Sequence, residues 1–417
     1  MKSEWNHSTI NDVCVLVTDG SHSSPKSVND GKYMVSVKDF TDYGFDFASC
    51  RMISNDDYET LKRNGCVPQI DDILIGKDGA RFFEDIIIYR QREKPALLSS
   101  IAILRCDKSK ILPDFLYYVL RTPSFRQDVK DNYGSGSAIP RIILKDFKRM
   151  MVSYPSLEKQ QAIISVLTAI DSKIQANTEI NDNLAEQIKT ICTAWLSDYA
   201  PFGGVLPDDW SKTPLSSIAD FVSGYSYKGT ELTESNIAMA TIKNFDRKGG
   251  FKLDGYKEIV PSSKLKDTQH AELFDTLIAH TDLTQNAEVI GNAEPVMSKS
   301  GYSDIVFSMD LVKVVPKNSE VSKFLIAAIL QDKRFKAHCL GYVNGTTVLH
   351  LSKKALPEYK LYLPRSMDEL KPLDDIVTAL YKKIASNISE NTQLELLRNS
   401  LLPKLMSGEI DVSAVQL

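Results

Sequence analysis

Residues 170–184 read Ile-Asp-Ser-Lys-Ile-Gln-Ala-Asn-Thr-Glu-Ile-Asn-Asp-Asn-Leu, and residues 380–394 read Leu-Tyr-Lys-Lys-Ile-Ala-Ser-Asn-Ile-Ser-Glu-Asn-Thr-Gln-Leu. The two stretches share a lysine, an isoleucine, two asparagines and the final leucine in the same register. Self-similarity at a fixed spacing is the signature of a repeated structural unit. We therefore predict that the chain contains two copies of one unit, with these stretches at equivalent places.

The repeat extends far upstream of these stretches. Residues 133–155 align with 342–364, residues 72–75 with 275–278, and residues 38–40 with 243–245. Each copy is thus a globular region followed by the repeated stretch. The boundaries predicted from this organisation are 1–155 for a first globular domain, 156–200 for a first long helix, 201–365 for a second domain, and 366–417 for a second long helix and tail.

The repeated stretch predicts a long helix with one apolar seam. In each copy, two series of positions seven residues apart are apolar or asparagine, which is the pattern of a coiled coil, and Arg398 departs from it. A helix of about 40 residues measures roughly 60 Å. The residues expected to pair the two helices are Ile170, Ile174, Asn177, Asn181 and Leu184 in the first, and Leu380, Ile384, Asn387, Asn391 and Leu394 in the second.

The asparagines of the seam carry a further expectation. They lie near the middle of each helix, so an antiparallel pair of helices brings all four together. Polar residues in such a seam commonly fix the register at a cost in stability. We expect Pro201 and Pro403 to mark the ends of the two helices, because proline removes a backbone donor and clashes with the preceding turn.

The globular regions read as mixed α and β structure. Short apolar or β-branched runs between Gly-, Asp- and Ser-rich turns predict strands at 33–37, 73–75, 86–89, 101–104 and 150–154. Only residues 113–121 and their counterpart 323–330 read as helices. The predicted fold class is α+β: two globular mixed α/β domains in a tandem pseudo-repeat, separated by two long antiparallel coiled-coil helices.

Composition limits the classes of protein that fit. A chain of 417 residues with 43% hydrophobic content can bury more than one core. No stretch resembles a signal peptide or is long enough to cross a bilayer, so we expect a cytoplasmic protein without membrane contact. The net charge of −4 is a mild argument against nucleic acid, but the acidic excess lies in the two helical segments. A DNA-binding surface would be a local cluster on the near-neutral globular domains.

The sequence contains no catalytic or metal-binding motif that withstands inspection. It has no G-x-x-x-x-G-K-[ST] phosphate loop, no Pro-Pro dipeptide for holding a flipped base, and no H-E-x-x-H. Asp171 and Lys173 resemble a fragment of a nuclease site, but we expect both on the solvent flank of the helix. The six cysteines form no C-x-x-C pair, which argues against a zinc ribbon and a disulfide scaffold. We therefore predict no catalytic residues and no metal.

Three polar loops recur in register in the two globular domains and fit DNA reading. Lys and Arg address guanine edges, Asn addresses adenine, and Gly-rich turns with hydroxyl groups suit phosphate. Any one of these residues taken alone is more often a solvated loop residue. The candidates are Lys38, Asp39, Lys243, Asn244, Arg247 and Lys248 in the first loops, Lys77, Arg81 and His280 in the second, and Ser135, Ser137, Asn344, Thr346 and Thr347 in the third.

Further motifs make a family resemblance specific. Pro155-x-x-x-x-Gln160 opens a helix of the type I-x-x-[IL]-x-x-[ILV]-D-x-K-I, and the chain nears its end with Leu401-Leu-Pro-Lys-Leu-Met-Ser-Gly-Glu-Ile410. This order resembles the specificity subunits of type I restriction-modification systems along the whole chain. The second copy departs from the pattern, because 366–371 lacks the Glu-Gln pair that Lys159-Gln160 nearly preserves. The start of the second helix is therefore left open.

The resemblance implies a function in DNA recognition. Each globular domain would be a target-recognition domain for one half of a split DNA site. The helices would dock two modification (methyltransferase) subunits and set the spacing of the half-sites. The resemblance implies no catalysis and no cofactor in this chain: S-adenosylmethionine would belong to the methyltransferase subunits, and ATP and Mg to the restriction (nuclease and translocase) subunits. The alternative is a coiled-coil scaffold that binds proteins without reading DNA.

Overall fold

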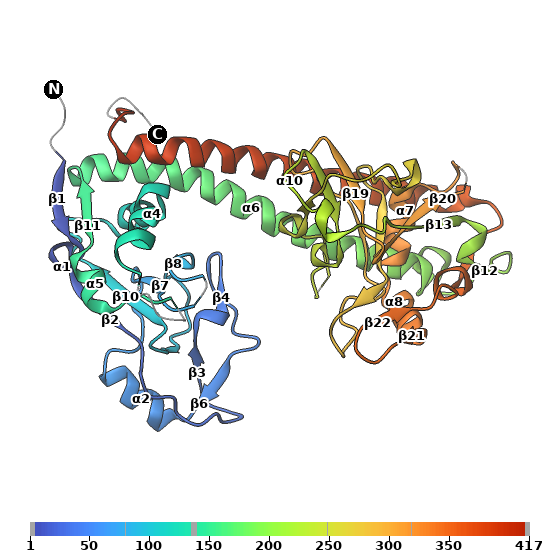
Figure 1. The fold of residues 1–417 in the computed structure, drawn as a ribbon. Helices are drawn as coiled ribbons and strands as arrows, with labels where there is room; N and C mark the ends of the chain where they lie inside the picture. The colour runs from blue at the N-terminus through green and yellow to red at the C-terminus, as the bar shows by residue number, and fades with distance from the viewer. Residues whose placement is uncertain (1–4, 80, 135–139, 248, 318, 413–417) are drawn as a thin grey trace. The chain divides into compact units, whose positions relative to one another are not determined.

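The computed structural model describes residues 5–79, 81–134, 140–247, 249–317 and 319–412. The chain forms two compact units, a first of residues 1–172 with 395–417, and a second of residues 173–394 (Figure 1). Two long helices, α6 (Leu157–Leu196) and α10 (Lys371–Met406), contribute a segment to each unit. Each unit therefore contains a globular domain and a part of both long helices.

A four-stranded antiparallel sheet forms the centre of the first unit. Its order is β2 (Cys14–Asp19), β10 (Ile101–Cys106), β7 (Ile73–Gly76) and β8 (Ile86–Ile88). One face packs against helices through Ile73 and Ile75, and the other packs against Val35 and Phe45 through Leu74. Both faces are buried, which explains the continuous apolar runs of these strands.

Shorter elements surround this sheet. The helices are α1 (Ile10–Val13), α2 (Asn55–Arg63), α3 (Pro113–Arg121), α4 (Pro123–Asn132) and α5 (Leu144–Arg149). The strands are β1 (Asn6–Thr9), β3 (Lys32–Val35), β4 (Phe40–Thr41), β5 (Gly44–Phe45), β6 (Arg51–Ile53), β9 (Ala96–Leu97) and β11 (Met151–Tyr154).

The second unit has the same plan. Its central sheet has the order β13 (Ala219–Ser223), β20 (Leu311–Pro316), β16 (Thr276–Ala279) and β18 (Ala293–Pro295). The other strands are β12 (Ser211–Pro214), β14 (Ile237–Ala240), β15 (Lys257–Glu258), β17 (Thr281–Asp282), β19 (Asp304–Phe307), β21 (Val343–Asn344), β22 (Leu349–Leu351) and β23 (Lys360–Leu363). The helices of its domain are α7 (Lys323–Leu330), α8 (Lys333–Leu340) and α9 (Ala355–Glu358).

The sheet topology confirms the internal repeat. β2-β10-β7-β8 in the first unit corresponds to β13-β20-β16-β18 in the second. The smaller sheets β6-β3-β9 and β15-β14-β19 correspond as well, and each contains one parallel pair. β1-β11 and β12-β23 close each domain next to its long helix. The two halves therefore share a mixed α/β fold, as the sequence predicts.

The predicted helices 113–121 and 323–330 coincide with α3 and α7. The prediction that they are the only helices of the globular regions is wrong, because α2, α4, α5 and α8 are helical too. α4 follows α3 directly: the Thr122 hydroxyl accepts a hydrogen bond from Phe125 N at 3.3 Å, and Pro123 occupies the first turn. These cap signals are present in the sequence, but short helices lack the long periodicity that identifies a helix.

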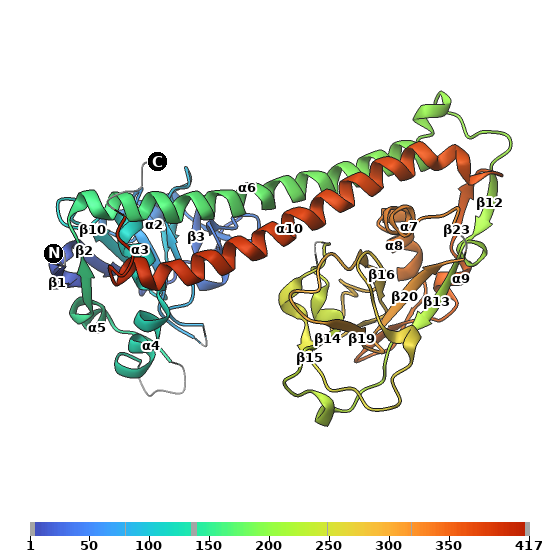
Figure 2. The same cartoon turned by 90° about the horizontal axis from the view of Figure 1, so that it is seen from above.

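Within the second unit, α6 and α10 run antiparallel and meet at the four asparagines of the seam. Asn177 Nδ2 donates to Asn391 Oδ1 at 2.8 Å, and Asn387 Nδ2 donates to Asn181 Oδ1 at 2.8 Å. Figure 2 shows the two helices alongside one another. The expected meeting of the asparagines is confirmed. The apolar members of the seam in this unit are buried or partly buried, namely Ile174, Leu184, Leu380, Ile384 and Leu394.

Within the first unit, Arg398, the residue that departs from the apolar pattern of the seam, forms an ion pair. Arg398 Nη1 lies 2.8 Å from Asp171 Oδ1, and the Tyr118 hydroxyl donates to Asp171 Oδ2 at 2.7 Å. Ile170 is buried beside it. Asp171 therefore faces the partner helix, and the expectation that it lies on the solvent flank is wrong.

The helix ends differ in part from the expectation. α6 ends at Leu196, shortly before Pro201, but α10 continues through Pro403 to Met406. Leu402 and Leu405 are buried in the first unit, and about 1.5–3 kcal/mol from each offsets the roughly 3 kcal/mol cost of a proline. At its other end, α10 begins at Lys371 after a 3-10 turn, Met367–Leu370.

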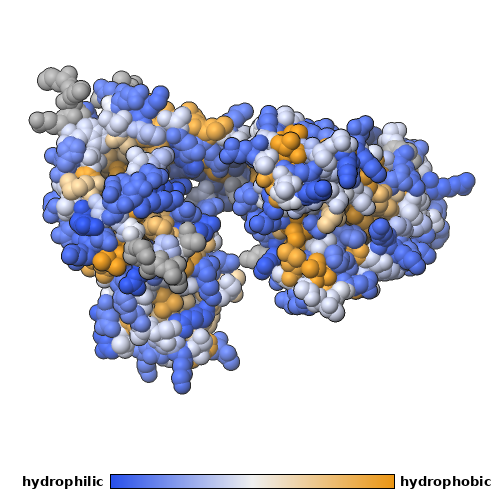
Figure 3. Space-filling model, viewed as in Figure 1, coloured by the Kyte–Doolittle hydropathy of each residue, from blue (hydrophilic) through white to orange (hydrophobic). Residues whose placement is uncertain are grey.

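The visible surface of each unit is mainly hydrophilic, with scattered apolar patches (Figure 3). Among the described residues, no helix combines the length and apolar character needed to span a lipid bilayer. The described part of the chain also lacks any group of three or more His, Cys, Asp or Glu side chains that could hold a metal. All six cysteines are free thiols.

Candidate nucleic-acid interface

A turn of the same design carries the first loop of each unit. In the first unit, Asp39 Oδ2 accepts hydrogen bonds from Ser36 N at 2.8 Å and Ser36 Oγ at 3.1 Å. In the second, Asn244 Oδ1 accepts from Thr241 N at 2.8 Å, and Asn244 Nδ2 donates to the Lys252 carbonyl at 2.7 Å. Both side chains are buried, Asn244 completely. Asp39 and Asn244 therefore shape the loops from inside.

This geometry corrects the expectation that Asp39 and Asn244 contact DNA. The amide groups of Asn244 that would address an adenine edge already bind within the protein. The preceding residues, Lys38 and Lys243, are exposed. In each unit, a buried polar residue fixes the turn and presents the lysine beside it to solvent.

The two basic candidates of the second loop in the first unit lie in different environments. Lys77 Nζ is 3.3 Å from Asp19 Oδ2, and both side chains are 8% exposed. Breaking such a buried pair costs roughly 3–5 kcal/mol, so Lys77 has a structural role and its assignment to DNA contact is not supported. Arg81 is exposed, with Nη2 2.7 Å from Asp85 Oδ1. Only Arg81 is available to a ligand.

His280, in the second loop of the second unit, is partly buried. Burial is the main cause that lowers the pKa of its imidazole, and the nearby His350 and Lys353 lower it further. A neutral imidazole offers one donor and one acceptor but no charge. His280 therefore suits a hydrogen bond to a base edge better than a phosphate contact.

The three loops of the second unit meet at one side of the domain. The first loop and the segment 282–289, which continues the second loop, line a cavity of about 580 Å³. β17 and the hairpin β21–β22 form one small sheet, so the second and third loops are neighbours. Gln285 Nε2 donates to the Thr346 carbonyl at 2.8 Å. Asn344, Thr346 and Thr347 are exposed near the tip of this hairpin.

The loops of the first unit are joined in a similar way. Gly79 N donates to the Pro140 carbonyl at 3.0 Å, which ties the second loop to the end of the third. Asp85 and, more weakly, Asp42 of the first loop raise the pKa of Arg81, because the first loop lies near the second. Three candidates lie outside the described residues, namely Ser135, Ser137 and Lys248.

Arg247 is an exposed ionic group of the first loop in the second unit. Its Nε lies 3.0 Å from Glu288 Oε2, and the arginine side chain is 68% exposed. An exposed pair of this kind contributes roughly 0.2–1 kcal/mol. Arg247 can therefore leave Glu288 for a phosphate or a guanine edge at little cost.

Two basic residues that the sequence reasoning missed lie directly after the third loops. Arg141 and His350 align with each other in the repeat, and both are exposed. Arg141 forms a β-bridge with Asp78, and His350 pairs with Thr281, so each lies beside the second loop of its unit. The repeat alignment contained this signal, because both positions carry a basic side chain.

The buried Gln160 explains the Pro-x-x-x-x-Gln motif. Its Oε1 accepts from Leu112 N at 2.8 Å, and its Nε2 donates to the carbonyls of Lys110 and Pro155 at 2.9 and 3.0 Å. These three bonds tie the first turn of α6 to the globular domain. The motif thus has a structural role at the junction of domain and helix.

Comparison with known proteins relates this arrangement to restriction-modification systems. Residues 2–186 match a family model, Methylase_S, described as the type I restriction modification DNA specificity domain. The type I restriction enzyme MjaIX specificity subunit of Methanocaldococcus jannaschii is 24% identical over 328 residues, or 73% of this chain and 71% of that protein. The HindI specificity subunit of Haemophilus influenzae is 22% identical over 375 residues, or 74% of this chain and 80% of that protein.

A solved structure shares the fold. The S subunit of a type I restriction-modification system from M. genitalium superposes with a TM-score of 0.52 at 18% identity. The superposition covers 97% of this chain and 96% of that one. The mixed α/β fold in tandem with long helices is therefore common to both proteins.

Proposed function

We propose that this chain is a specificity subunit of a type I restriction-modification system, to which its family match and its relatives are similar, and that each of its domains reads one half of a bipartite DNA site. The observation that carries the proposal is the meeting of three polar loops at one side of the second domain, together with the bond that ties the second loop of the first domain to Pro140 after its third loop. In the second unit the first loop and the segment after the second loop share a cavity, and the second and third loops share a small sheet. Exposed basic side chains on such a surface supply phosphate contacts and base contacts together.

In both units the proposed contacts come from the same three loops, but the residue types differ. Exposed Lys38 and Arg81 serve the first half-site, with the third-loop residues Ser135 and Ser137. The second half-site uses a larger set with positive charge, hydroxyl groups and one imidazole, namely Lys243, Arg247, Lys248, His280, Asn344, Thr346 and Thr347. The basic groups address guanine or phosphate, and the hydroxyl and backbone groups of the third loops address phosphate.

The two long helices have a separate role in this proposal. They dock two methyltransferase subunits and set the spacing of the half-sites, and the asparagine contacts between Asn177, Asn181, Asn387 and Asn391 fix their register. The chain contributes recognition and no catalysis. S-adenosylmethionine belongs to the methyltransferase subunits, and ATP and Mg to the restriction subunits that complete the enzyme.

The test is co-expression of the full chain with its methyltransferase subunits, followed by sequencing of methylated sites in the host with and without this gene. We expect a bipartite methylated site that depends on the chain. Lys38→Ala should weaken methylation of one half-site by about 1–3 kcal/mol, and Lys243→Ala that of the other. In each case the unaffected half-site is the internal control for folding.

Two outcomes contradict the proposal. Equal losses at both half-sites from either change would show that the domains do not read independently. Methylation of unchanged sequence in the absence of the chain, with no shift of DNA in a gel by the complex, would favour the protein-binding scaffold.

A further inference from the structure

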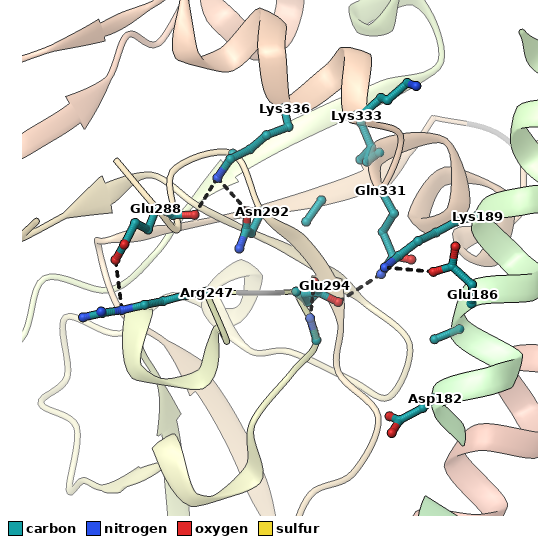
Figure 4. Close-up of a pocket in the computed structure, with 16 residues that line it drawn as sticks. Asp182, Glu186, Lys189, Arg247, Glu288, Asn292, Glu294, Gln331, Lys333 and Lys336 are labelled. Atoms are coloured by element: carbon teal, nitrogen blue, oxygen red, sulfur yellow. Dashed lines mark hydrogen bonds and ion pairs between the residues drawn. The ribbon is translucent and has the colours of Figure 1, made fainter. Parts of the chain in front are cut away.

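Glu294 is a carboxylate buried in the central sheet of the second unit. It lies on β18 and is 7% exposed. It borders a cavity of about 470 Å³ that is also lined by the first loop, α6 and α8 (Figure 4). Glutamate is almost never buried unless it is paired, because removal of an ionised carboxylate from water is costly. Its presence here calls for a physical reason.

The first unit shows that the fold itself does not need a carboxylate at this position. β16 pairs with β18 so that Leu277 lies opposite Glu294, and β7 pairs with β8 so that Leu74 lies opposite Ile87. Leu74 and Leu277 are aligned in the repeat, so Ile87 is the counterpart of Glu294. Ile87 is 2% exposed and packs in an apolar cluster. The sheet can therefore be formed with an apolar side chain at this position, so the carboxylate of Glu294 has a role other than packing of the sheet.

Glu294 joins the first loop to the long helix α10. Its Oε1 accepts from Gly250 N at 2.7 Å, and its Oε2 accepts from Gln331 Nε2 at 2.9 Å. Gln331 Oε1 in turn accepts from the Tyr381 hydroxyl on α10 at 3.1 Å. Figure 4 shows Glu294 pointing to Gln331, with the loop on its other side. The carboxylate is the middle link of a hydrogen-bonded chain from loop to helix.

The loop is a tight turn that is closed by its own backbone bonds and anchored by Glu294. Asp246 N donates to the Gly250 carbonyl at 3.0 Å, and Gly249 N donates to the Asp246 carbonyl at 3.1 Å. Gly249 and Gly250 have φ values of +98° and +108°, a region that glycine adopts and other residues rarely enter. Asn292 Nδ2 donates to the Asp246 carbonyl at 3.1 Å, so the start of the same turn is held as well. Arg247 lies between these two anchors. Because Gly250 is hydrogen-bonded to Asp246, the residue before Arg247, the bond from Glu294 to the Gly250 amide helps to set the direction in which Arg247 is presented.

We propose that Glu294 is a positioning residue for the first loop of the second unit, and that it holds Arg247 in register for the second half-site by tying Gly250 to Gln331 and Tyr381. This inference rests on the proposed function. Glu294 itself contacts no base or phosphate. It acts through the loop, so its loss changes discrimination between sequences more than the stability of the domain.

The chemistry of the carboxylate adds a pH dependence to one half-site only. Burial raises the pKa of Glu294 to about 7, while the Gly250 amide and the charge of Lys189 act in the opposite direction. Protonation converts one acceptor oxygen into a donor and loosens the link. Other titratable or charged groups line the same cavity or face Glu294. They are Asp182 and Glu186 on α6, Asp246 and Arg247 in the first loop, Glu288 in the segment before β18, Lys333 and Lys336 on α8, and Tyr381 on α10.

The link itself is tested by hydrogen exchange on the full chain at pH 8. We expect Glu294→Ile, which copies the first unit, to speed exchange of the Gly250 amide on the order of tenfold, since a hydrogen bond to a charged group is lost. Glu186→Gln is the matched control: it removes a carboxylate from the same cavity without touching the loop. Equal exchange in wild type and Glu294→Ile would overturn the proposal.

The consequence is tested in the complex with the methyltransferase subunits. The measured quantity is the ratio of methylation rates for the cognate duplex and for one with a single base change in one half-site. We expect Glu294→Ile to reduce this ratio on the order of tenfold for the second half-site and to leave the first unchanged. In wild type the ratio for the second half-site should rise from pH 6 to pH 8, and Glu294→Gln should abolish that rise.

The outcomes separate this inference from the proposed function. Equal loss at both half-sites, or no change at the second, would overturn the positioning role. If Glu294→Ile does not fold, the pH profile of Glu294→Gln decides instead, and a profile like that of wild type overturns it. If the wild-type complex methylates no specific sequence, the proposed function fails, while the exchange experiment still decides the link between Glu294 and Gly250.

Discussion

The two units share one sheet order but anchor their first loops with different side chains. In the first unit, Gln91 does this with its amide: Phe45 N donates to Gln91 Oε1 at 2.8 Å, and Gln91 Nε2 donates to the Phe45 carbonyl at 3.0 Å. In the second unit the buried carboxylate of Glu294 binds Gly250. The strands that carry the loops are repeated, whereas each loop has its own anchor. A repeat of this kind can change what a loop presents without changing the sheet beneath it.

The helix pair shows the same contrast. Asp171 and Tyr381 are equivalent in the repeat, as are Ile188 and Arg398. The first unit pairs Asp171 with Arg398 as an ion pair at 2.8 Å, whereas Tyr381 and Ile188 both belong to the buried apolar core of the second unit. Equivalent places on the two long helices are therefore filled by an ion pair in one unit and by two side chains of the buried core in the other.

The comparison of Ile87 with Glu294 gives the largest expected effect. Ile87→Glu places a carboxylate among apolar side chains of the first unit with no anchored loop to receive it. An uncompensated buried charge costs roughly 3–5 kcal/mol, so the unfolding temperature of the first unit should fall by several degrees at pH 8. Calorimetry measures this unfolding temperature, and Ile87→Leu is the control variant. A loss no greater than that of the control would show that the first unit already contains a partner for the charge.

The free energy of unfolding of the second unit should depend on pH through Glu294. Glu294→Ile should remove this dependence, which is similar in size to the loss expected for Ile87→Glu. The folded pKa, about 7, lies above the unfolded value of 4.5. The folded state therefore binds the proton more tightly, and its stability falls as the pH rises from about 4.5 to 7. The whole effect is about 3 kcal/mol at 1.4 kcal/mol per pKa unit. Urea unfolding at pH 5 and pH 8 should show a smaller difference between the two pH values in the variant. Identical differences would mean that Glu294 is not buried as a titrating group.

The contrast on the two long helices can be tested by giving the first unit the residues of the second, that is, by replacing Asp171 and Arg398 with their counterparts. Arg398→Ile alone leaves Asp171 facing an apolar neighbour, and we expect a loss of about 2 kcal/mol, since the pair is only partly shielded from water. The double change Asp171→Tyr with Arg398→Ile copies the second unit and should restore most of this loss. A double-mutant cycle by thermal unfolding measures the coupling. Additive losses would show that the two positions do not act as a pair.

The asparagines give the smallest expected change in stability. Changing Asn177, Asn181, Asn387 and Asn391 together to leucine should raise the stability of the second unit by about 1–2 kcal/mol, because two buried and two partly buried polar groups are removed. The gain should come with a loss of register, seen as methylation of sites whose half-sites are one base pair nearer or farther apart. An unchanged spacing preference would remove the register role but not the stability effect.

Much of the architecture follows from local patterns in the sequence. The repeat, the seam with its asparagines, and the helices α3 and α7 depend on periodicity and on residues close together in the chain. The meeting of the asparagines needs only two helices in opposite directions. Arg141 and His350 were within reach of the same reasoning, because they align in the repeat.

The roles of the individual polar residues depended on the tertiary structure. Lys77 and Lys38 look alike in the sequence. In the structure, Lys77 is buried in an ion pair with Asp19, whereas Lys38 is exposed. Glu294 gains its role from Gly250, Gln331 and Tyr381, which are distant in the chain. Periodicity is a local property that the sequence by itself determines. Whether a polar side chain faces water or an internal partner is decided by segments that only folding brings together, since burial costs far more without a partner than with one.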